Sequence, residues 1–520
     1  LEQKLLAHTQ GDVQQPAMAT EESKSTKQLN QQQSSPPQSQ QQQGKEPLNI
    51  LVLYPDDWKH DSLQDANPNV HTPFLSQLAK EGMRFTRNAV TSSVCWISRA
   101  TFFTGQYVYR HNSTYLYCPT FTFPQYWKDT WAGRLIKKGY FVGQVGKWQY
   151  HNGMNGGFLD KTNQGLGGFN WTGLHEGKHW FPPGPNHREK AKNYPRKGNL
   201  IPAADLSKEE ALYFLREKRP KDRPFALTVA FYPPKAVGNN AEPGGQWSPT
   251  EKYYQMYQKK TFQRPYNITE AYNAILPIFQ EKTMARGRYK QRWHTEEQFQ
   301  EGMKRYHALV THVDEASKHI VDELKRQGIY NNTLVIFTSD NGLMLGHHGL
   351  AGKWHPWEES IRVPLIIYDP RMPQEKRGTT DDSYTLNIDL AETILGAAGL
   401  KPSPYMQGRD IADLYLERRG NAQNVPWRED FYYEFPIDYP DSTALVTRKW
   451  KYVRYRGMKH QQLFDLENDP YELRDLIGSE EVKEKILPKL IERYNQVRAE
   501  AEYSAGIPIP ACVKQEKFYP

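Results

Sequence analysis

Runs of apolar residues along the chain alternate with stretches that carry apolar residues at helical spacing. Three runs have the length and the nearly continuous apolar character of strands covered on both faces: 49–54, 226–231 and 333–338. After the first run, Thr72 and Pro73 predict the N-cap and first turn of a helix stopped by Gly82, and residues 307–326 predict a long amphipathic helix. This alternation predicts an α/β sheet.

The first 47 residues lack this pattern and offer almost nothing apolar to bury. Glutamine, serine and proline dominate them, as in 31–37 and 40–43, and this composition predicts a disordered segment. The segment is interpreted as a flexible tether or as a tail without a role, because composition does not separate the two. Order is expected to begin at Asn49.

Length and composition are typical of an enzyme with one large core and a smaller companion. The 520 residues are 38% hydrophobic and 13% aromatic, which excludes a disordered protein, and the formal net charge is +8. A diffuse positive excess is compatible with a nucleic acid, an anionic glycan or no partner. Cys95, Cys118 and Cys512 share no metal-binding spacing and imply no disulfide framework.

The chain contains no apolar run of the ~18 residues that a transmembrane helix needs, so no transmembrane segment is expected. Its amino terminus lacks the pattern of a signal peptide and starts at Leu1 rather than Met. We interpret the sequence as a mature or engineered form from which an export signal has been removed. A secreted or periplasmic location is expected.

Acidic residues follow two of the predicted strands. Asp56 and Asp57 come after the first, and Asp340 and Asn341 come after 333–338. Ligands gather beyond the carboxyl ends of strands in open α/β sheets, so these side chains are expected to meet. Singly, an acidic pair is more often a turn or a helix cap, but clustered oxygen ligands without a histidine or cysteine pair favour calcium or magnesium over zinc.

Cys95 precedes a stretch, 98–104, that predicts the opening turns of a helix closed by Gly105. Backbone N–H groups and the positive end of the helix dipole would make this position a natural anion site. The alternative is a small buried thiol. Arg99, four residues after Cys95, favours the anion site.

The segment Cys95-Trp96-Ile97-Ser98-Arg99, followed by Thr104-Gly105-Gln106 and Arg110-His111, resembles the signature of type I sulfatases. Residues 340–353, continued to Pro364, resemble the second long signature of that family, and 463–473 resemble the sequence that closes its smaller subdomain. The resemblance runs from about Asn49 to about Ile477. It implies an alkaline phosphatase-like fold, in which a large, mixed, mostly parallel sheet is flanked by helices and a smaller C-terminal α+β subdomain carries a short antiparallel sheet. The expected boundaries are 1–47 for the disordered segment, 48–425 for the catalytic domain and 426–520 for the smaller subdomain and tail.

The resemblance also implies the chemistry. Cys95 would be oxidised to formylglycine (3-oxoalanine) by a formylglycine-generating maturation enzyme, and one hydroxyl of the hydrated aldehyde would attack the sulfur of a sulfate ester. A single calcium ion, Ca²⁺, would be held by Asp56, Asp57, Asp340 and Asn341, with the residue made from Cys95 completing its sphere. Fixed positive charge would come from Arg99, Lys147 and Lys353, which stabilises charge that builds on the sulfate oxygens.

Three positions depart from the family pattern. Ile97 stands where Pro or Ala is usual, so conversion of Cys95 is expected to need a particular maturation partner. Gln149 and Lys235 each stand where a histidine is usual. His151 is the expected substitute for the first histidine, and Lys235 is expected to contact the sulfate. His348 and His355 are expected to bind the substrate. The candidates for the proton donor are His151, His348 and His355, with a capping or surface role as the alternative for each.

The stretch 153–180 is rich in glycine and aromatic residues, which predicts either a sugar-stacking rim or an ordinary irregular loop. Its aromatic and imidazole side chains include Phe158, Phe169, Trp171, His179 and Trp180. Together with the basic composition, the rim favours a sulfated polysaccharide over a small sulfate ester or a nucleic acid. The alternatives are a phosphodiester or phosphonate hydrolase of the same superfamily, and an unmodified glycan-binding protein.

Overall fold

The computed structural model describes residues 47–114, 120–122, 124–150, 168–182, 199–238, 242–265, 275, 277, 279, 283–416, 426–437, 440–456, 458 and 460–503. The chain divides into two units, 1–46 and 47–520, and all of the described residues belong to the second. The predicted disordered segment lies almost wholly outside the described residues, as do His151, Cys118 and Cys512.

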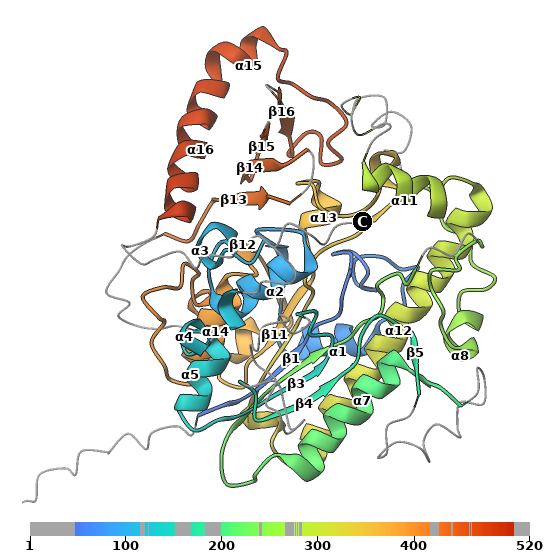
Figure 1. The fold of residues 1–520 in the computed structure, drawn as a ribbon, viewed down its shortest axis with the longest axis vertical. Coiled ribbons are helices and arrows are strands. Elements are labelled where there is room, and N and C mark those ends of the chain that lie inside the picture. The colour runs from blue at the N-terminus through green and yellow to red at the C-terminus, as the bar shows by residue number, and fades with distance from the viewer. Residues whose placement is uncertain are drawn as a thin grey trace, which may run out of the picture. The chain divides into compact units, whose positions relative to one another are not determined.

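A sheet of eight strands forms the centre of this unit (Figure 1), in the order β12-β2-β11-β8-β1-β7-β3-β4. The strands are β1 (Asn49–Leu53), β2 (Met83–Ala89), β3 (Phe141–Gly146), β4 (Trp171–Leu174), β7 (Phe225–Ala230), β8 (Thr333–Thr338), β11 (Leu365–Tyr368) and β12 (Thr379–Leu386). Neighbouring strands are parallel except where β11 pairs with β2 and β8. The predicted mixed, mostly parallel sheet is confirmed.

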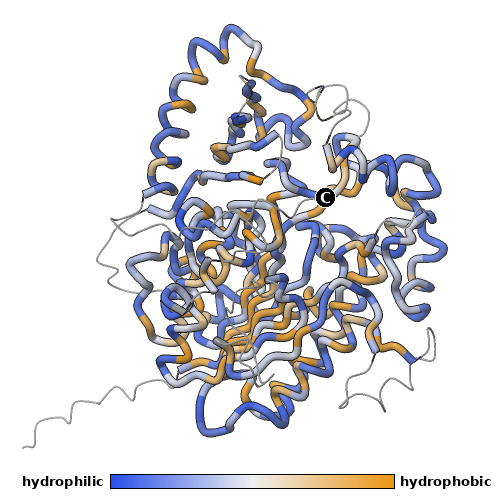
Figure 2. The backbone as a smooth tube through the Cα atoms, viewed as in Figure 1, coloured by the Kyte–Doolittle hydropathy of each residue, from blue (hydrophilic) through white to orange (hydrophobic). Residues whose placement is uncertain are grey.

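The side chains of β1 show why its sequence is apolar throughout. Leu51 and Leu53 join a core with helices α1 (Pro73–Glu81), α7 (Ala203–Tyr213) and α12 (Glu296–Arg326). Ile50 and Val52 join a second core with α2 (Cys95–Thr104), α5 (Trp131–Lys137) and α14 (Asp389–Ala397). Since successive side chains of a strand point to opposite faces, a strand between two helical layers needs apolar residues at every position. Figure 2 shows the hydrophobic colouring concentrated in these central strands.

A four-stranded antiparallel sheet follows, with β13 (Asp430–Phe435), β14 (Ser442–Thr447), β15 (Trp450–Tyr455) and β16 (His460–Asp465) in sequential order. Helix α16 (Leu487–Glu502) packs on it through Tyr494 and Val497, which share a core with Tyr432 and Leu445. This short antiparallel sheet confirms the predicted C-terminal architecture. The boundary at residue 425 stays a prediction.

The remaining described elements are short. The helices are α3 (Val108–His111), α4 (Pro124–Trp127), α8 (Glu251–Gln255), α11 (Met284–Arg292), α13 (Glu358–Ile361) and α15 (Glu480–Lys485), and the strands are β5 (Trp180–Phe181), β6 (Ile201–Pro202), β9 (Met344–Leu345) and β10 (Ala351–Gly352). Among the helices that the structure describes, none combines the length and the hydropathy needed to cross a membrane.

Helix α1 begins and ends where predicted, but Thr72 does not cap it. The Thr72 hydroxyl instead accepts a hydrogen bond from the Gln64 N–H at 2.9 Å. The free N–H groups of Phe74 and Leu75 donate to the carboxylate of Asp314 on α12, at 3.1 and 2.8 Å. A partner distant in sequence therefore replaces the local cap.

Two other helices start earlier than predicted. Helix α12 begins at Glu296 rather than near His307, behind a capping box in which Thr295 and Gln298 bond each other's backbone. Helix α2 begins at Cys95 itself rather than at Ser98. Cys95 therefore occupies the first helical position, where backbone N–H groups have no partner within the helix.

Candidate active site

Polar residues gather beyond the carboxyl ends of four neighbouring parallel strands, β8, β1, β7 and β3. In the same order, the residues that follow these strands are Asp340 with Asn341, Asp56 with Asp57, Lys235, and Lys147. Cys95 joins them at the start of α2, which follows β2, a strand that runs in the same direction because both β2 and β8 are antiparallel to β11. The sheet therefore brings segments separated by hundreds of residues to one edge.

The four predicted metal ligands lie together and are at most 5% exposed. The Asn341 Nδ2 group donates to Asp57 Oδ1 at 2.7 Å, and the Asp57 N–H donates to Asp340 Oδ1 at 3.3 Å. One ligand atom each from Asp56, Asp57 and Cys95 lies within 4.8 Å of the others. The clustered carboxylate oxygens of Asp56 and Asp57 are the ligand type that a hard cation such as Ca²⁺ or Mg²⁺ prefers.

Two ammonium groups flank the Cys95 sulfur. Lys353 Nζ lies 2.7 Å from Sγ and 2.9 Å from Asn341 Oδ1, and it also contacts the Asp57 carboxylate. Lys235 Nζ lies 3.2 Å from Sγ. An oxygen nucleophile at the position of Sγ would therefore stand between two fixed positive charges.

Two further cations, Arg99 and Lys147, contact the carboxylates of the site. Arg99, one turn along α2 from Cys95, donates to Asp340 Oδ2 from Nε at 3.0 Å and pairs with the same oxygen through Nη2 at 2.8 Å. Its Nη1 group donates to the Lys147 carbonyl at 3.2 Å, and the Lys147 ammonium group contacts Asp56. The guanidinium lies 5.0 Å from the centre of the Tyr54 ring. These contacts fix Arg99 and Lys147 in one orientation.

The electrostatic balance keeps Asp56 ionised. Burial and the neighbouring Asp340 raise the pKa of Asp56, but Lys147, Lys235 and Lys353 outweigh them and hold the pKa at about 2. Three carboxylates thus face four cationic side chains, and the site carries net positive charge before any metal binds. Such a site attracts anions.

The two lysines beside the sulfur stay protonated. Burial lowers the pKa of Lys353, but Asp57 and Cys95 raise it above the ordinary value. Burial also opposes the charge of Lys235, whose pKa Asp56 and Asp57 nevertheless hold well above the ordinary value. Both groups therefore offer N–H donors rather than lone pairs.

Comparison with known protein families identifies the family of this chain. A family model described as Sulfatase matches residues 49–400, and one described as N-sulphoglucosamine sulphohydrolase, C-terminal, matches residues 346–500. The chain belongs to the sulfatase family. It is an enzyme of the sulfuric ester hydrolase class, which confirms the resemblance of its two long motifs.

Relatives span most of this sulfatase. An arylsulfatase of Clostridium perfringens is 26% identical over 485 residues, covering 84% of this chain and 92% of the relative. An N-acetylglucosamine-6-O-sulfatase of Bacteroides thetaiotaomicron is 25% identical over 510 residues, covering 85% of each.

Two solved structures share the fold with a TM-score of 0.70 and 22% sequence identity. One is a protein in complex with its substrate D-glucosamine-2-N,6-O-disulfate, with 88% of this chain and 98% of that chain covered. The other is the phosphonate monoester hydrolase of Agrobacterium radiobacter, with 87% and 96% covered. At this identity the likeness establishes the alkaline phosphatase-like fold alone.

The histidines predicted as proton donors lie in different surroundings. His151 is outside the described residues. The His348 ring stacks on Trp357 at 4.3 Å between ring centres, and its Nε2 lies 3.6 Å from a Glu359 oxygen. His355 is 3% exposed and packs edge-on against the rings of Phe279 and Phe435. The described contacts of His355 are thus aromatic, and its role as a proton donor stays a prediction.

Two aromatic side chains of the expected sugar-stacking rim pack against other aromatic side chains of the protein. Phe169 lies against Trp127 and Trp148, with ring centres 5.1 and 5.2 Å apart, and Trp171 lies on Phe214 at 5.6 Å. The stacking interpretation was wrong for Phe169, because neighbouring aromatic side chains bury it. Trp171 is partly exposed, and for it the interpretation stays a prediction. Phe158 lies outside the described residues.

His179 and Trp180 of the same stretch support the loop of Lys235. The Ser248 N–H donates to His179 Nδ1 at 3.0 Å, so the proton of a neutral imidazole is on Nε2, which donates to the Lys235 carbonyl at 2.8 Å. Trp180 Nε1 donates to the Ser248 carbonyl at 2.9 Å. These side chains position a cation of the site instead of stacking on sugar.

The motif 463–473 supports the second signature through a buried ion pair. Lys451 Nζ on β15 lies 2.8 Å from Glu358 Oε1 and 2.7 Å from Glu472 Oε1. Glu472 Oε2 also accepts from the Glu358 N–H at 2.9 Å, at the start of α13. The C-terminal sheet thereby fixes the segment that follows Lys353.

Two arginines near the site were not predicted from the sequence. Arg288 and Arg292 lie on α11, and in both cases burial lowers the pKa while Asp57 acts in the opposite direction. The signal available in the sequence was the basic run 286–292, in which the two arginines are four residues apart and so share a helix face.

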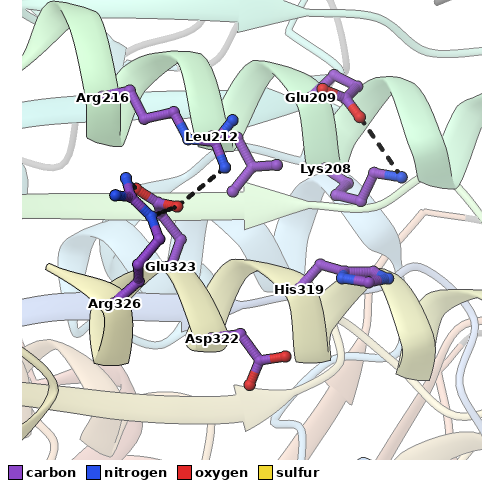
Figure 3. Close-up of a pocket in the computed structure, with 8 residues that line it drawn as sticks. All are labelled: Lys208, Glu209, Leu212, Arg216, His319, Asp322, Glu323 and Arg326. Carbon is purple, nitrogen blue, oxygen red and sulfur yellow. Dashed lines mark hydrogen bonds and ion pairs between the residues drawn. The ribbon is translucent and has the colours of Figure 1, made fainter.

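A shallow groove of about 510 Å³ lies elsewhere, between α7 and α12 (Figure 3). Several of its charged side chains pair with one another, as Arg216 and Arg326 do with Glu323 at 2.9 and 2.8 Å. None of the residues around Cys95 lines this groove, so it takes no part in the chemistry described above.

Proposed function

We propose that this sulfatase hydrolyses sulfate esters of a sulfated polysaccharide or oligosaccharide through a formylglycine made from Cys95. The observation that supports this most directly is the pair of ammonium groups, on Lys353 and Lys235, within 2.7 and 3.2 Å of the Cys95 sulfur. A sulfate ester whose sulfur approached this position would have both cations beside its oxygens. Charge that develops on those oxygens in the transition state would be stabilised without reorganisation.

The exposed fractions of the four cationic side chains suggest a different role for each pair. The side chain of Lys235 is 22% exposed, whereas that of Lys353 is 4% exposed. Lys235 therefore faces the open side, where the sugar leaves, and Lys353 faces the nucleophile. Arg99 and Lys147 are 3% and 2% exposed, and they hold Asp340 and Asp56 in place.

When converted, Cys95 would supply a hydrated aldehyde whose hydroxyl is the nucleophile. The fit of the oxygen donors supports one calcium ion held by Asp56, Asp57, Asp340 and Asn341, and such an ion would add Lewis acidity beside the nucleophile. Ile97 is fully buried in the core beneath α2, so conversion by a maturation enzyme is expected before the chain folds.

The glycan part of the proposal is supported by the net positive charge of the site and by the N-acetylglucosamine-6-O-sulfatase relative. The proton donor to the departing sugar remains a proposal among His151, His348 and His355. A secreted or periplasmic location also remains a proposal, and fractionation of the source cells would test it.

Mass spectrometry of the intact peptide that contains Cys95 tests the nucleophile. Protein made with a formylglycine-generating enzyme is expected to carry an aldehyde at this position. A thiol on all of the protein would instead identify an unmodified glycan-binding relative of sulfatases.

Matched rates test the reaction. The modified protein is expected to hydrolyse an aryl sulfate faster than the corresponding aryl phosphate diester or aryl phosphonate. The reverse order would identify a phosphodiester or phosphonate hydrolase, whose tetrahedral anion would use the same cations.

A further inference from the structure

Helix α11 joins the two loops that carry the lysines beside Cys95. Arg286 Nη1 donates to the Gly349 carbonyl at 2.7 Å, in the loop that leads to Lys353. Six residues later, Arg292 Nη2 donates to the Gly238 carbonyl at 3.4 Å, in the loop that follows Lys235. The helix therefore spans the space between the two loops, and Arg288 lies between its two anchors.

Arg288 stacks on the residue that follows Lys353. Its guanidinium carbon lies 4.6 Å from the centre of the Trp354 ring, and both side chains are partly exposed. Burial lowers the pKa of Arg288, whereas Asp57 and Cys95 raise it, so the guanidinium is within electrostatic reach of the reaction centre. Within the described ranges, no carboxylate is paired with Arg288.

Trp354 is held in an unfavourable backbone conformation. Its φ is 93°, in the left-handed region that a bulky side chain rarely adopts. The Tyr433 hydroxyl donates to the Trp354 carbonyl at 2.5 Å and also bonds Ser93 Oγ at 2.6 Å, two residues before Cys95. Strained residues that their surroundings hold in place cluster at binding sites.

A guanidinium placed over an indole ring makes its cation–π contact with the ring face, and its N–H groups can still donate to an oxyanion. Arg292 lies on the same face of the helix, one turn along, and adds positive potential that a bound anion would relieve. Burial depresses the pKa of Arg292 to about 10, as expected for a guanidinium short of negative neighbours.

We propose that Arg288, held on Trp354 and reinforced by Arg292, binds a second anionic group of the substrate. This rests on the proposed sulfatase function, and it selects glycans that carry a further sulfate or carboxylate near the ester that is cleaved. Lys235 and Lys353 then hold the reacting sulfate while Arg288 holds the second anion. The sugar between them is oriented by two charged contacts rather than by stacking.

Kinetics on three substrates test this. They are a neutral aryl sulfate, a disulfated disaccharide and a monosulfated disaccharide that contains a uronate. Substitution R288M keeps the stem on the indole and removes the charge, and K290M removes an exposed charge from the same helix. For R288M, kcat/KM on a substrate with a second anion is expected to fall roughly 10- to 100-fold, with the aryl sulfate changed by less than about threefold.

The two anionic substrates separate the sources of the second anion. Dependence on Arg288 with the disulfated sugar alone identifies a sulfate, and dependence with the uronate alone identifies a carboxylate. Equal losses on all three substrates, or equal losses in R288M and K290M, would overturn the proposal.

Binding measured without turnover separates this inference from the proposed function. In a C95A background, calorimetry with the disulfated and the uronate disaccharides is expected to show weaker binding when R288M is added. If the parent hydrolyses no sulfate ester but binding still depends on Arg288, the subsite stands and the reaction is wrong. Binding that is the same with and without Arg288 overturns the subsite.

Discussion

Lys353 Nζ lies 2.7 Å from the Sγ atom of Cys95, although 258 positions separate the two residues in the chain. The same ammonium group contacts Asp57 and lies 2.9 Å from the Asn341 amide oxygen, so it touches the position of the nucleophile and the predicted metal ligands at once. Any change at Lys353 therefore acts on the chemical step more than on the fold.

Replacing Lys353 by Met is expected to lower kcat about 100- to 1,000-fold, because a fixed donor to the sulfate oxygens is lost. The melting temperature should fall less than in K451M, since Lys235 still lies 3.4 Å from Asp57 when Lys353 is removed. Steady-state rates on an aryl sulfate check this, with K449M, which removes an exposed lysine, as the control. A kcat within about threefold of the parent would remove Lys353 from the catalytic machinery.

Bound calcium is expected to stabilise the folded protein, and substitution of a ligand residue is expected to reduce calcium binding. At calcium concentrations near 100 times Kd, binding to the folded state alone adds about 2.7 kcal/mol. Chelation should therefore lower the melting temperature, and added calcium should restore it. Substitution D340N should reduce the metal content measured by mass spectrometry, whereas D382N, at a carboxylate whose side chain is 67% exposed, should not. A melting temperature that changes neither on chelation nor on addition of calcium would argue against a bound calcium ion.

Lys451 is expected to be a stability residue. Substitution K451M leaves Glu358 and Glu472 buried without their cation, and breaking a buried pair in this way costs about 3–5 kcal/mol. Denaturant unfolding measures the loss. Substitution K449M on the neighbouring surface pair is the matched control, and it should leave stability nearly unchanged. Similar midpoints for the two variants would contradict the role of the buried network.

His355 is expected to make the fold sensitive to acid. Burial lowers its pKa from 6.5 to about 3, so the unfolded chain binds a proton that the folded chain excludes, and stability falls as pH drops below 6.5. At about pH 5.5 the cost is about 1.4 kcal/mol. Substitution H355F should remove this contribution, so that melting temperature falls less steeply with acid.

The same variant tests the predicted proton donor. Because aromatic rings surround His355, H355F is expected to keep most of the aryl sulfatase activity. A large loss of kcat with a preserved melting temperature, accompanied by loss of one limb of the pH–rate profile, would make His355 the proton donor after all.

Ile97 is expected to limit maturation of Cys95. It is the third residue of α2, where the backbone N–H has no partner within the helix, so I97P removes no helical hydrogen bond. Coexpression with a formylglycine-generating enzyme should give a higher fraction of aldehyde in I97P than in the parent, by peptide mass spectrometry. An unchanged fraction would show that Ile97 does not hinder the maturation enzyme.

Much of the site could be predicted because its residues sit in contiguous motifs. Asp56, Asp57, Asp340 and Asn341 directly follow apolar strands, and Arg99 is one helical turn from Cys95. The cap of α1 could not be predicted, because the carboxylate that accepts its N–H groups belongs to Asp314, and no local pattern relates the two segments. The prediction that Phe169 stacks on sugar was wrong for a similar reason, since composition does not distinguish a buried aromatic side chain from an exposed one.

The sequence by itself determined the α/β fold, since short-range periodicity carries that information. The resemblance of its motifs to those of sulfatases identified the family and the set of charged residues around Cys95. Only the tertiary structure decided which cations touch the sulfur, that Lys451 joins the C-terminal sheet to α13, and that Arg288 lies on Trp354. These relations depend on how strands pair and helices pack across long separations in the chain. Contacts of that kind are set by the burial of whole faces, and no single segment encodes them.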